Sequence, residues 1–560
     1  MISLGLHFGS HDASAAVVID GRLAAMMEQE RFDHRKHSSA FPKEAMDACL
    51  NLVGARLTDV DVVAYANDVE LTNTHKRAFI KRAYDGAFVP PLRAQADVER
   101  TLRAHVGDRV RLFHVDHHMA HAASAFLPSP FEESAIFSVD GMGNWVSTSL
   151  CLGRGAGIAV LKRIAHPHSL GLMYGAFTQY LGFQAACDEG KTMGLAPYGK
   201  PRFLDDLRGI CRYRNGELEL DLDYFTFHRD TLMDEQGHPR VWYSPRVVER
   251  FGPPRVPESE IDERAADMAC SVQALLEERC FELLRDLHAA TGSPNVCLAG
   301  GVALNCSMNG QIRAHTPFAN VFVLPAANDA GLSIGAALLA SADAGVPVRR
   351  EPLEHAYYGT EHGTAEIEAA LRTLPETVSV RRPAKLEEEV ADLLADHAIV
   401  GWYQGRMEFG PRALGHRSIL ANPTRADAKD IVNAKVKFRE AFRPFAPVVV
   451  EEEAQRYFEY GGRQPFMLTV DMVRPECRTV IPAVTHVDGT ARVQTVAPTQ
   501  NPELHALLLA VKRRNGVPVL LNTSFNIRGD TIVRTPDDAV RCFLETGMNA
   551  LAIGPFLLCK

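Results

Sequence analysis

A repeated pattern of strand and glycine turn is the strongest constraint on the fold of this chain. Residues 3–21 read as a strand, a turn and an apolar strand that ends in Asp-Gly. Residues 133–153 repeat an apolar strand ending in Asp-Gly before a second strand, and 295–310 give a third strand with a glycine turn. A fourth strand leads into an apolar helix within 320–342. Such units, recurring among helices, predict a duplicated α/β architecture.

The chain is too long for a single hydrophobic core. At 560 residues it predicts two or three domains. The stretch 341–390 is rich in proline, glycine and charge, which suits a connection between domains. Beyond it, a helical pattern and several buried strands predict a second α/β unit. We therefore expect a first domain over 1–345, a connection over 346–385 and a second domain over 386–560.

Charge and composition exclude several classes of protein. The formal net charge of -9 argues against a protein that coats nucleic acid, because phosphate contacts need an excess of Lys and Arg. The N-terminal stretch lacks a basic leader, and no apolar run approaches the roughly 18 residues of a membrane helix. The 11 cysteines form no CxxC pair, so we expect free thiols. These features predict a cytoplasmic protein without nucleic-acid or membrane partners.

Two histidines in "HVDHHMAHAASAF" have the spacing of metal ligands. His117 and His121 are four residues apart, so on a helix their imidazoles share one face. With 22 histidines in 560 residues, chance supplies about one such pair. The alternative is therefore that both are ordinary histidines at a helix start or in the core.

Two aspartates at predicted strand ends complete a candidate metal site. Asp140 ends the strand in "IFSVDG", and Asp329 precedes a helix in "PAANDAG". The alternatives are a turn residue for Asp140 and a helix N-cap for Asp329. Two imidazoles with two carboxylates suit Fe(II) or Zn, and the sequence does not choose between them.

Two glycine-rich stretches are candidates for binding a nucleotide. "GGVALN" begins with Gly300 and Gly301 and ends with Asn305, and glycine lets backbone N–H groups approach a phosphate. "DEGKTMGLAPYG" adds Lys191 in a further glycine loop. The alternative for both stretches is a surface turn.

Basic residues gather on glycine- and proline-rich stretches of the second domain. "QGRMEFGPRALGHRS" holds three arginines interleaved with glycines, and rigid guanidinium groups bind two phosphate oxygens at once. A solvated basic surface would instead place such charges on helices beside acids. We favour an anion pocket, whose candidate residues are Arg412, Lys435, Lys437, Arg439, Arg443, Arg492, Ser524, Asn526 and Arg528.

Eight motifs resemble those of one enzyme family, and the match runs in order from residue 3 to 560. They are "HDASAA", "HHMAHAASA", "VDGMGN", "GKTMGLAPYG", "GGVALN", "FGPRALGHRS", "RPFAP" and "LNTSFN". Together they resemble the O-carbamoyltransferases of antibiotic and nodulation-factor biosynthesis. The resemblance implies an actin/Hsp70-like (Kae1-like) duplicated N-terminal domain and a YrdC-like α/β C-terminal domain.

The resemblance also implies two reactions. The C-terminal domain would make carbamoyl-adenylate from carbamoyl phosphate and ATP, and the N-terminal domain would pass the carbamoyl group to a hydroxyl of a small-molecule natural product. The implied cofactors are ATP, carbamoyl phosphate as co-substrate, and Fe(II) or another divalent metal, with Mg²⁺ a further candidate beside ATP. The oligomeric state stays open, a homodimer being one alternative.

The resemblance assigns roles residue by residue. His11 would be the general base that takes the proton of the acceptor hydroxyl. The metal ligands would be His117, His121, Asp140 and Asp329. The adenylate would be held by Lys191, Gly300, Gly301 and Asn305. Carbamoyl phosphate and ATP would be held by Arg412, Lys437, Arg443, Arg492, Ser524 and Asn526.

Two other functions compete with this interpretation. A tRNA threonylcarbamoylation enzyme would need a broad basic surface, which the acidic net charge disfavours. An ATP-dependent binding or chaperone module could share the fold, because fold does not fix function, but it would not need the arginine cluster. Hydrogenase-maturation carbamoyltransferases add a zinc-finger region, which the lack of CxxC pairs excludes here.

Overall fold

The computed structural model describes residues 1–81, 89–234 and 239–560. The chain divides into two compact units. Unit 1 comprises residues 1–9, 14–24 and 55–352, and unit 2 comprises residues 10–13, 25–54 and 353–560.

Unit 1 is built on two five-stranded sheets of the same strand order. In each sheet the strand that comes first in the sequence lies at the centre, with the next two strands on one side of it. The first sheet runs β3 (Arg22–Glu28), β2 (Ser14–Ile19), β1 (Ile2–His7), β4 (Val62–Tyr65) and β5 (Arg111–His114). The second sheet runs β8 (Gly157–Ala165), β7 (Val146–Arg154), β6 (Glu133–Gly143), β11 (Asn295–Ala299) and β12 (Asn320–Val323).

Strand directions repeat between the two sheets as well. The central strand β1 is antiparallel to β2 and parallel to β4, which is parallel to β5. Likewise, β6 is antiparallel to β7 and parallel to β11, which is parallel to β12. The first predicted unit, residues 3–21, lies in one sheet, and the other three lie in the second sheet. The two sheets repeat the same order and directions, and the predicted actin/Hsp70-like duplicated α/β fold is confirmed.

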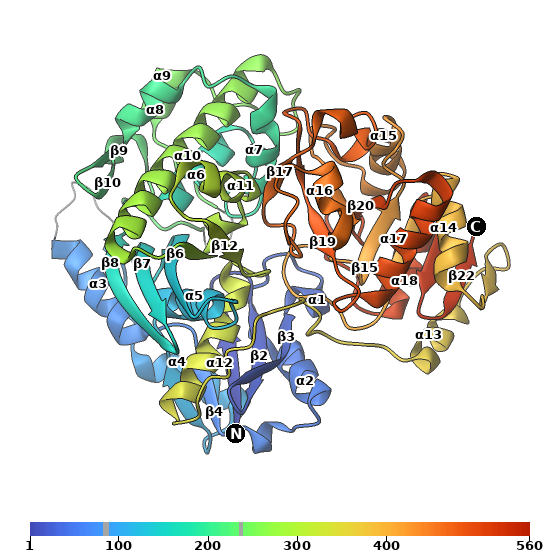
Figure 1. The fold of residues 1–560 in the computed structure, drawn as a ribbon. Helices are drawn as coiled ribbons and strands as arrows, with labels where there is room; N and C mark the ends of the chain where they lie inside the picture. Colours follow the sequence, from blue (N-terminus) through green and yellow to red (C-terminus); the bar gives the residue numbers. More distant parts are fainter. Residues whose placement is uncertain (82–88, 235–238) are drawn as a thin grey trace. The chain divides into compact units, whose positions relative to one another are not determined.

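Two helices rich in small residues pack against each other and against the two sheets of unit 1. Helix α12 (Leu332–Asp343) packs on β1, β2 and β4, helix α5 (His117–Phe126) packs on β6 and β11, and the two helices contact each other (Figure 1). A Cβ atom on Gly335 of α12 would lie 1.9 Å from the carbonyl oxygen of Ala120 in α5. The alanine-rich sequence of α5 is thus explained by close helix packing. The shared core comprises Val62, Ala64, Ala66, Val115, Ala120, Leu332, Ala336 and Ala340.

Unit 2 contains an eight-stranded mixed sheet with a hydrophobic cluster on each face. Val448 and Val450 belong to one cluster and Val449 to the other, as expected for strand residues that alternate between faces. Helices α14 (Leu386–Ala395) and α17 (Pro502–Asn515) contribute to the first cluster. The sheet order is β13 (Ser379–Arg381), β22 (Phe556–Cys559), β21 (Ala550–Ile553), β14 (Val400–Tyr403), β15 (Arg417–Ala421), β20 (Val519–Ser524), β16 (Ala446–Val450) and β19 (Gln494–Val496).

Part of the N-terminal sequence belongs to unit 2. Arg31 is buried, and its guanidinium group donates a hydrogen bond of 2.9 Å to the carbonyl oxygen of Gly410. The backbone N–H of Gly410 in turn donates to the Glu28 carboxylate at 2.5 Å. Residues 25–54 are therefore part of the folded core of unit 2, an arrangement that composition along the chain did not indicate.

All 11 cysteines are free thiols, as expected. No helix in the described ranges combines the length and the apolarity that crossing a membrane requires.

Candidate functional site

Helix α5 positions the two predicted histidine ligands. Asp116 caps the helix, because its side chain accepts a hydrogen bond of 2.7 Å from the backbone N–H of Met119. One helical turn apart, His117 and His121 are both buried, and their ring centroids lie 4.7 Å apart. The side-chain oxygen of Asn144 accepts a hydrogen bond of 2.6 Å from the backbone N–H of His117, which fixes the first turn.

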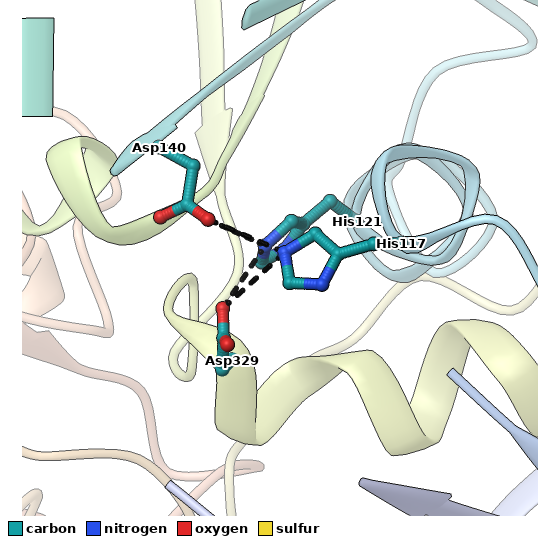
Figure 2. Close-up of side chains that lie close together, drawn as sticks. All are labelled: His117, His121, Asp140 and Asp329. Carbon is teal, nitrogen blue, oxygen red and sulfur yellow. Dashed lines mark hydrogen bonds and ion pairs between the residues drawn. The ribbon is translucent and has the colours of Figure 1, made fainter. Parts of the chain in front are cut away.

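The two predicted aspartates face these histidines (Figure 2). Asp140 lies within β6, and Asp329 begins a short 3-10 helix, Asp329–Gly331, that leads into α12. The Asp140 side chain therefore projects from inside the strand and not from a turn after it. One donor atom from each of the four side chains lies within 4.8 Å of the other three.

The spacing of these donor atoms fits a divalent cation. His117 Nε2 lies 3.2 Å from Asp140 Oδ2 and 3.5 Å from Asp329 Oδ1, and His121 Nε2 lies 3.4 Å from Asp329 Oδ1. Neighbouring donors around one ion with bonds of about 2.1 Å are separated by roughly 3 Å or slightly more. Neither ring nitrogen of His121 makes a hydrogen bond within the described residues, although both are buried. His121 Nε2 pairs with the carboxylates of Asp329 at 3.4 Å and Asp140 at 3.9 Å, and a metal ion between these groups would give it a closer partner.

The ionisable side chains of this cluster shift one another's pKa. Burial would raise the pKa of Asp140, but His117 and His121 hold it well below its usual value of 3.8. Burial alone would lower the pKa of His121, but the carboxylates of Asp140 and Asp329 raise it to about 9. By contrast, burial lowers the pKa of the neighbouring His118 to about 3, and its Nε2 lies 2.9 Å from the carbonyl oxygen of Val146. The two carboxylates and two imidazoles thus form a buried donor set that could hold a divalent cation.

The first glycine-rich stretch supports the cluster directly. The backbone N–H of Gly301 donates a hydrogen bond of 3.0 Å to Asp140 Oδ1, on the opposite side of the carboxylate from His117. Gly300 has φ +88°, and a Cβ atom there would lie 2.2 Å from the carbonyl oxygen of Val139. The two glycines allow this turn to approach β6, and the Gly301 N–H bonds to the Asp140 carboxylate. Contact of Gly300 and Gly301 with an adenylate stays a prediction.

Asn305 and Lys191 have other partners. The side-chain oxygen of Asn305 caps helix α11 (Cys306–His315) through the backbone N–H of Met308 at 3.0 Å. Its amide also exchanges hydrogen bonds of 2.9 and 3.0 Å with the amide of Gln273. Lys191 Nζ lies 3.0 Å from Asp188 Oδ2. Asn305 therefore stabilises the start of helix α11 and its contact with Gln273. Adenylate binding by Asn305 and Lys191 stays a prediction.

The structure places His11 in unit 2, whereas the metal cluster belongs to unit 1. His11 Nδ1 lies 3.0 Å from Asp12 Oδ2, and His37 Nδ1 lies 2.7 Å from Asp12 Oδ1. Burial would raise the pKa of Asp12, but the two histidines lower it well below 3.8. An ionised Asp12 fixes the proton of His11 on Nδ1, which leaves Nε2 as the basic nitrogen of the ring.

Lys437 is the centre of the predicted anion site in unit 2. It ends a π-helical turn, Asn433–Lys437, and its buried ammonium group donates to oxygens of Ser524 and Asn526. The distances are 2.9 Å to the Ser524 carbonyl, 3.1 Å to Ser524 Oγ, 3.0 Å to the Asn526 carbonyl and 2.5 Å to Asn526 Oδ1. The structure thus brings Lys437 into contact with two residues that lie almost 90 positions later in the sequence.

Arginines surround this lysine. Burial lowers the pKa of Lys437 well below 10.5, and the positive charges of Arg439 and Arg443 lower it further. Burial also lowers the pKa of Arg439 to about 9, together with the charges of Arg443, Arg492 and Arg412. Burial is the larger cause of both shifts, and repulsion between neighbouring cations adds to it. A polyanion would relieve that repulsion.

Only one arginine of the "GRMEFGPRALGHR" stretch is assigned to this group of cations. Arg417 is fully buried, donates to the carbonyl oxygen of Gln404 at 2.5 Å and lies over the Tyr403 ring at 3.7 Å. Arg406 donates to the Tyr358 carbonyl oxygen at 2.8 Å. Arg406 and Arg417 therefore bind backbone carbonyl groups, and phosphate binding by the arginines of this stretch stays a prediction.

Sequence reasoning misses one supporting residue of this site. Arg439 is among the predicted candidates of the anion pocket, and its charge acts together with those of Arg443, Arg492 and Arg412. Glu408 is buried and accepts hydrogen bonds from the backbone N–H groups of Leu414 at 2.6 Å and Arg417 at 3.2 Å. It thereby folds the loop that carries Arg412, and no sequence signal marked it.

Comparison with known proteins identifies the family. The family models Carbamoyltransferase N-terminus and Carbamoyltransferase C-terminus match residues 3–338 and 391–560. The nodulation protein NolNO of Sinorhizobium fredii is 38% identical over 565 residues, covering 98% of this chain and 79% of that protein. The 3'-hydroxymethylcephem-O-carbamoyltransferase of Streptomyces clavuligerus is 30% identical, covering 95% and 94%. An uncharacterised protein of Synechocystis, sll1178, is 37% identical, covering 100% and 96%. The chain is an enzyme and belongs to the carbamoyltransferase family.

Proposed function

We propose that this carbamoyltransferase makes carbamoyl-adenylate in unit 2 and transfers its carbamoyl group to a hydroxyl of a small molecule. The group of cations around Lys437 carries the proposal. A buried lysine beside several arginines is unstable without anionic ligands, and carbamoyl phosphate and ATP supply several negative charges each.

The first reaction consumes both co-substrates. Water releases carbamate and phosphate from carbamoyl phosphate, and a carbamate oxygen then attacks the α-phosphorus of ATP. A new O–P bond forms, the bond to the β-phosphate oxygen breaks, and pyrophosphate leaves. Lys437 and the surrounding arginines would hold the phosphates and stabilise the charge that develops on their oxygens, with Ser524 and Asn526 orienting the lysine.

The second reaction consumes the adenylate. An acceptor hydroxyl attacks the carbamoyl carbon, the bond to the AMP phosphate breaks, and the hydroxyl proton passes to a base. His11, oriented by Asp12, would be that base. His117, His121, Asp140 and Asp329 would hold a divalent metal, with Fe(II) and Zn both fitting the donors. When bound, such an ion supplies positive charge that stabilises a phosphate leaving group.

The acceptor belongs to the class of small hydroxyl compounds. Relatives named as nodulation proteins and as a cephem O-carbamoyltransferase match over nearly the whole chain, which supports an alcohol acceptor of secondary metabolism. The acidic net charge of -9 gives no support to a tRNA acceptor.

Pyrophosphate release tests the proposal. With both co-substrates present, the enzyme should release pyrophosphate only when carbamoyl phosphate is supplied, and Arg412→Ala should reduce this release by about 10²-fold or more. Arg425→Ala is the matched control, because Arg425 is exposed and pairs with Asp427 at 2.9 Å. Formation of ADP without carbamoyl phosphate, or full activity of the Arg412 variant, would contradict the proposal.

A further inference from the structure

We infer that His7, which the family resemblance does not assign, is a positioning residue of the metal centre that holds the Asp329 carboxylate. The inference rests on the proposed function, because it assumes that the His117, His121, Asp140 and Asp329 cluster binds a divalent ion. It adds a fifth side chain, contributed by the first strand of the chain.

His7 faces the side of Asp329 that the other histidines do not use. His7 Nε2 lies 3.3 Å from Asp329 Oδ2, whereas His121 Nε2 lies 3.4 Å from Asp329 Oδ1. Both His7 and Asp329 are buried, with side-chain exposures of 4% each. A proton on His7 Nε2 would therefore hold Oδ2 and leave Oδ1 directed at the cluster.

The first sheet fixes the position of His7. His7 is the last residue of β1, paired in register with Ser14 of β2. The Ser14 hydroxyl donates to the carbonyl oxygen of Ala330 at 2.7 Å and to Ser333 Oγ at 2.9 Å, and both partners follow Asp329 closely in sequence. The same hairpin thus binds the segment that carries Asp329 and places the imidazole beside it.

Both carboxylates of the cluster share this arrangement. Asp140 uses Oδ1 to accept the Gly301 N–H at 3.0 Å and turns Oδ2 toward His117 at 3.2 Å. Asp329 turns Oδ1 toward the cluster and Oδ2 toward His7. Each carboxylate therefore has one anchored oxygen and one oxygen available to an ion. Partners of this outer kind keep ligands oriented and contribute about 10- to 100-fold to metal affinity.

Metal titration tests the role of His7 without relying on turnover. The full-length apo-enzyme is titrated with Co(II) against a competing chelator, and the visible spectrum of bound Co(II) is recorded. We expect one Co(II) per wild-type chain. His7→Leu should weaken binding about 10- to 100-fold, and His7→Gln, which retains an N–H donor, should recover most of that loss. The spectrum should keep its band positions in both variants.

A matched control is offered by His118, a buried histidine next to the ligands. Its ring nitrogens lie 3.2 Å from Ser138 Oγ and 2.9 Å from the Val146 carbonyl oxygen, so His118→Gln should change thermal stability but not Co(II) affinity. Wild-type Co(II) affinity in folded His7→Leu would overturn the inference, as would shifted bands in His7→Gln, which would make His7 a direct ligand. If wild-type enzyme bound no stoichiometric Co(II), the proposed metal centre itself would fail.

Discussion

At the scale of single residues, Lys437 is the clearest example of a buried cation whose surroundings favour a bound anion. Its ammonium group is buried, and its pKa is lowered well below 10.5 by burial and by the nearby Arg439 and Arg443. Ser524 and Asn526 supply oxygens that hold it in place. The protonated form of Lys437 is therefore destabilised in the free enzyme and stabilised once an anion binds.

This shift predicts proton uptake on binding. A polyanion beside Lys437 raises its pKa again, so at a pH between the lowered and the restored pKa the complex binds up to one more proton than the free enzyme. The uptake should vanish at lower pH, where the lysine is already charged. Calorimetric titration of carbamoyl phosphate in buffers of different ionisation enthalpy, repeated over a series of pH values below 10.5, measures it. Equal binding enthalpies in all buffers would contradict the shift.

A second prediction concerns His11. Asp12 lies 3.0 Å from His11 Nδ1 and orients the ring of the proposed general base. Removing this base in His11→Ala should reduce carbamoyl transfer by about 10²- to 10⁴-fold, while pyrophosphate release persists. Asp12→Asn should show the same pattern more weakly, since the ring remains but loses its orientation. Product analysis by mass spectrometry and a pyrophosphate assay on the same samples separate the two reactions. Equal loss of both activities would remove the assignment of His11 as the base.

The clustering of His117 and His121 could be predicted from sequence, and the residues that support the cluster could not. His117 and His121 are four apart on one helix, so their shared face follows from local geometry. His7 and Gly301 reach the cluster only through the sheet register and a close backbone approach, which depend on distant parts of the chain. The structural role of Arg417 could not be predicted either, because the backbone carbonyl groups that it contacts become its neighbours only after folding.

At the scale of elements, helices α5 and α12 bring histidines and a carboxylate together. Their closest approach joins Gly335 of α12 to Ala120 of α5, which lies between the two histidine ligands. Asp329 stands immediately before α12. The distance between the two helices therefore sets the distance between the imidazoles and the carboxylate.

Enlarging the residue at this contact tests the link. Gly335→Ala would place a Cβ atom 1.9 Å from the Ala120 carbonyl oxygen, so the helices must separate. We expect the free energy of unfolding to fall by about 1–3 kcal/mol and the Co(II) affinity to fall as well. Gly209→Ala is the control, since a Cβ atom on this exposed glycine of helix α8 (Leu204–Ile210) meets nothing within 4 Å. Denaturant unfolding and Co(II) titration provide the measurements, and an unchanged Gly335 variant would contradict the packing argument.

Element positions followed well from sequence where periodicity was strong. The predicted strand and glycine-turn units are strands of the two sheets, one unit in the first sheet and three in the second, and the alanine-rich stretch forms α5. The π-helical turn at Asn433–Lys437 was not predicted, because it departs from the ordinary helical period where Lys437 turns toward Ser524.

At the scale of the whole molecule, the two clusters of ionisable side chains belong to different units, and His11 belongs to the same unit as Lys437. The cation site around Lys437 belongs to unit 2 and the His117 and Asp329 cluster to unit 1. The division is not a simple cut along the sequence, since residues 10–13 and 25–54 belong to unit 2. Variants in the complete chain are therefore better tests than truncations.

Carbamoyl-phosphate-dependent pyrophosphate release by Asp329→Ala is the most direct test of this division. Asp329 belongs to unit 1, whereas Lys437 and Arg412 belong to unit 2. The variant should release pyrophosphate at a rate within about threefold of wild type, because mutations at independent sites act separately, and it should form no carbamoylated product. A folded Asp329→Ala enzyme that releases no pyrophosphate would contradict the separation of adenylate formation from carbamoyl transfer.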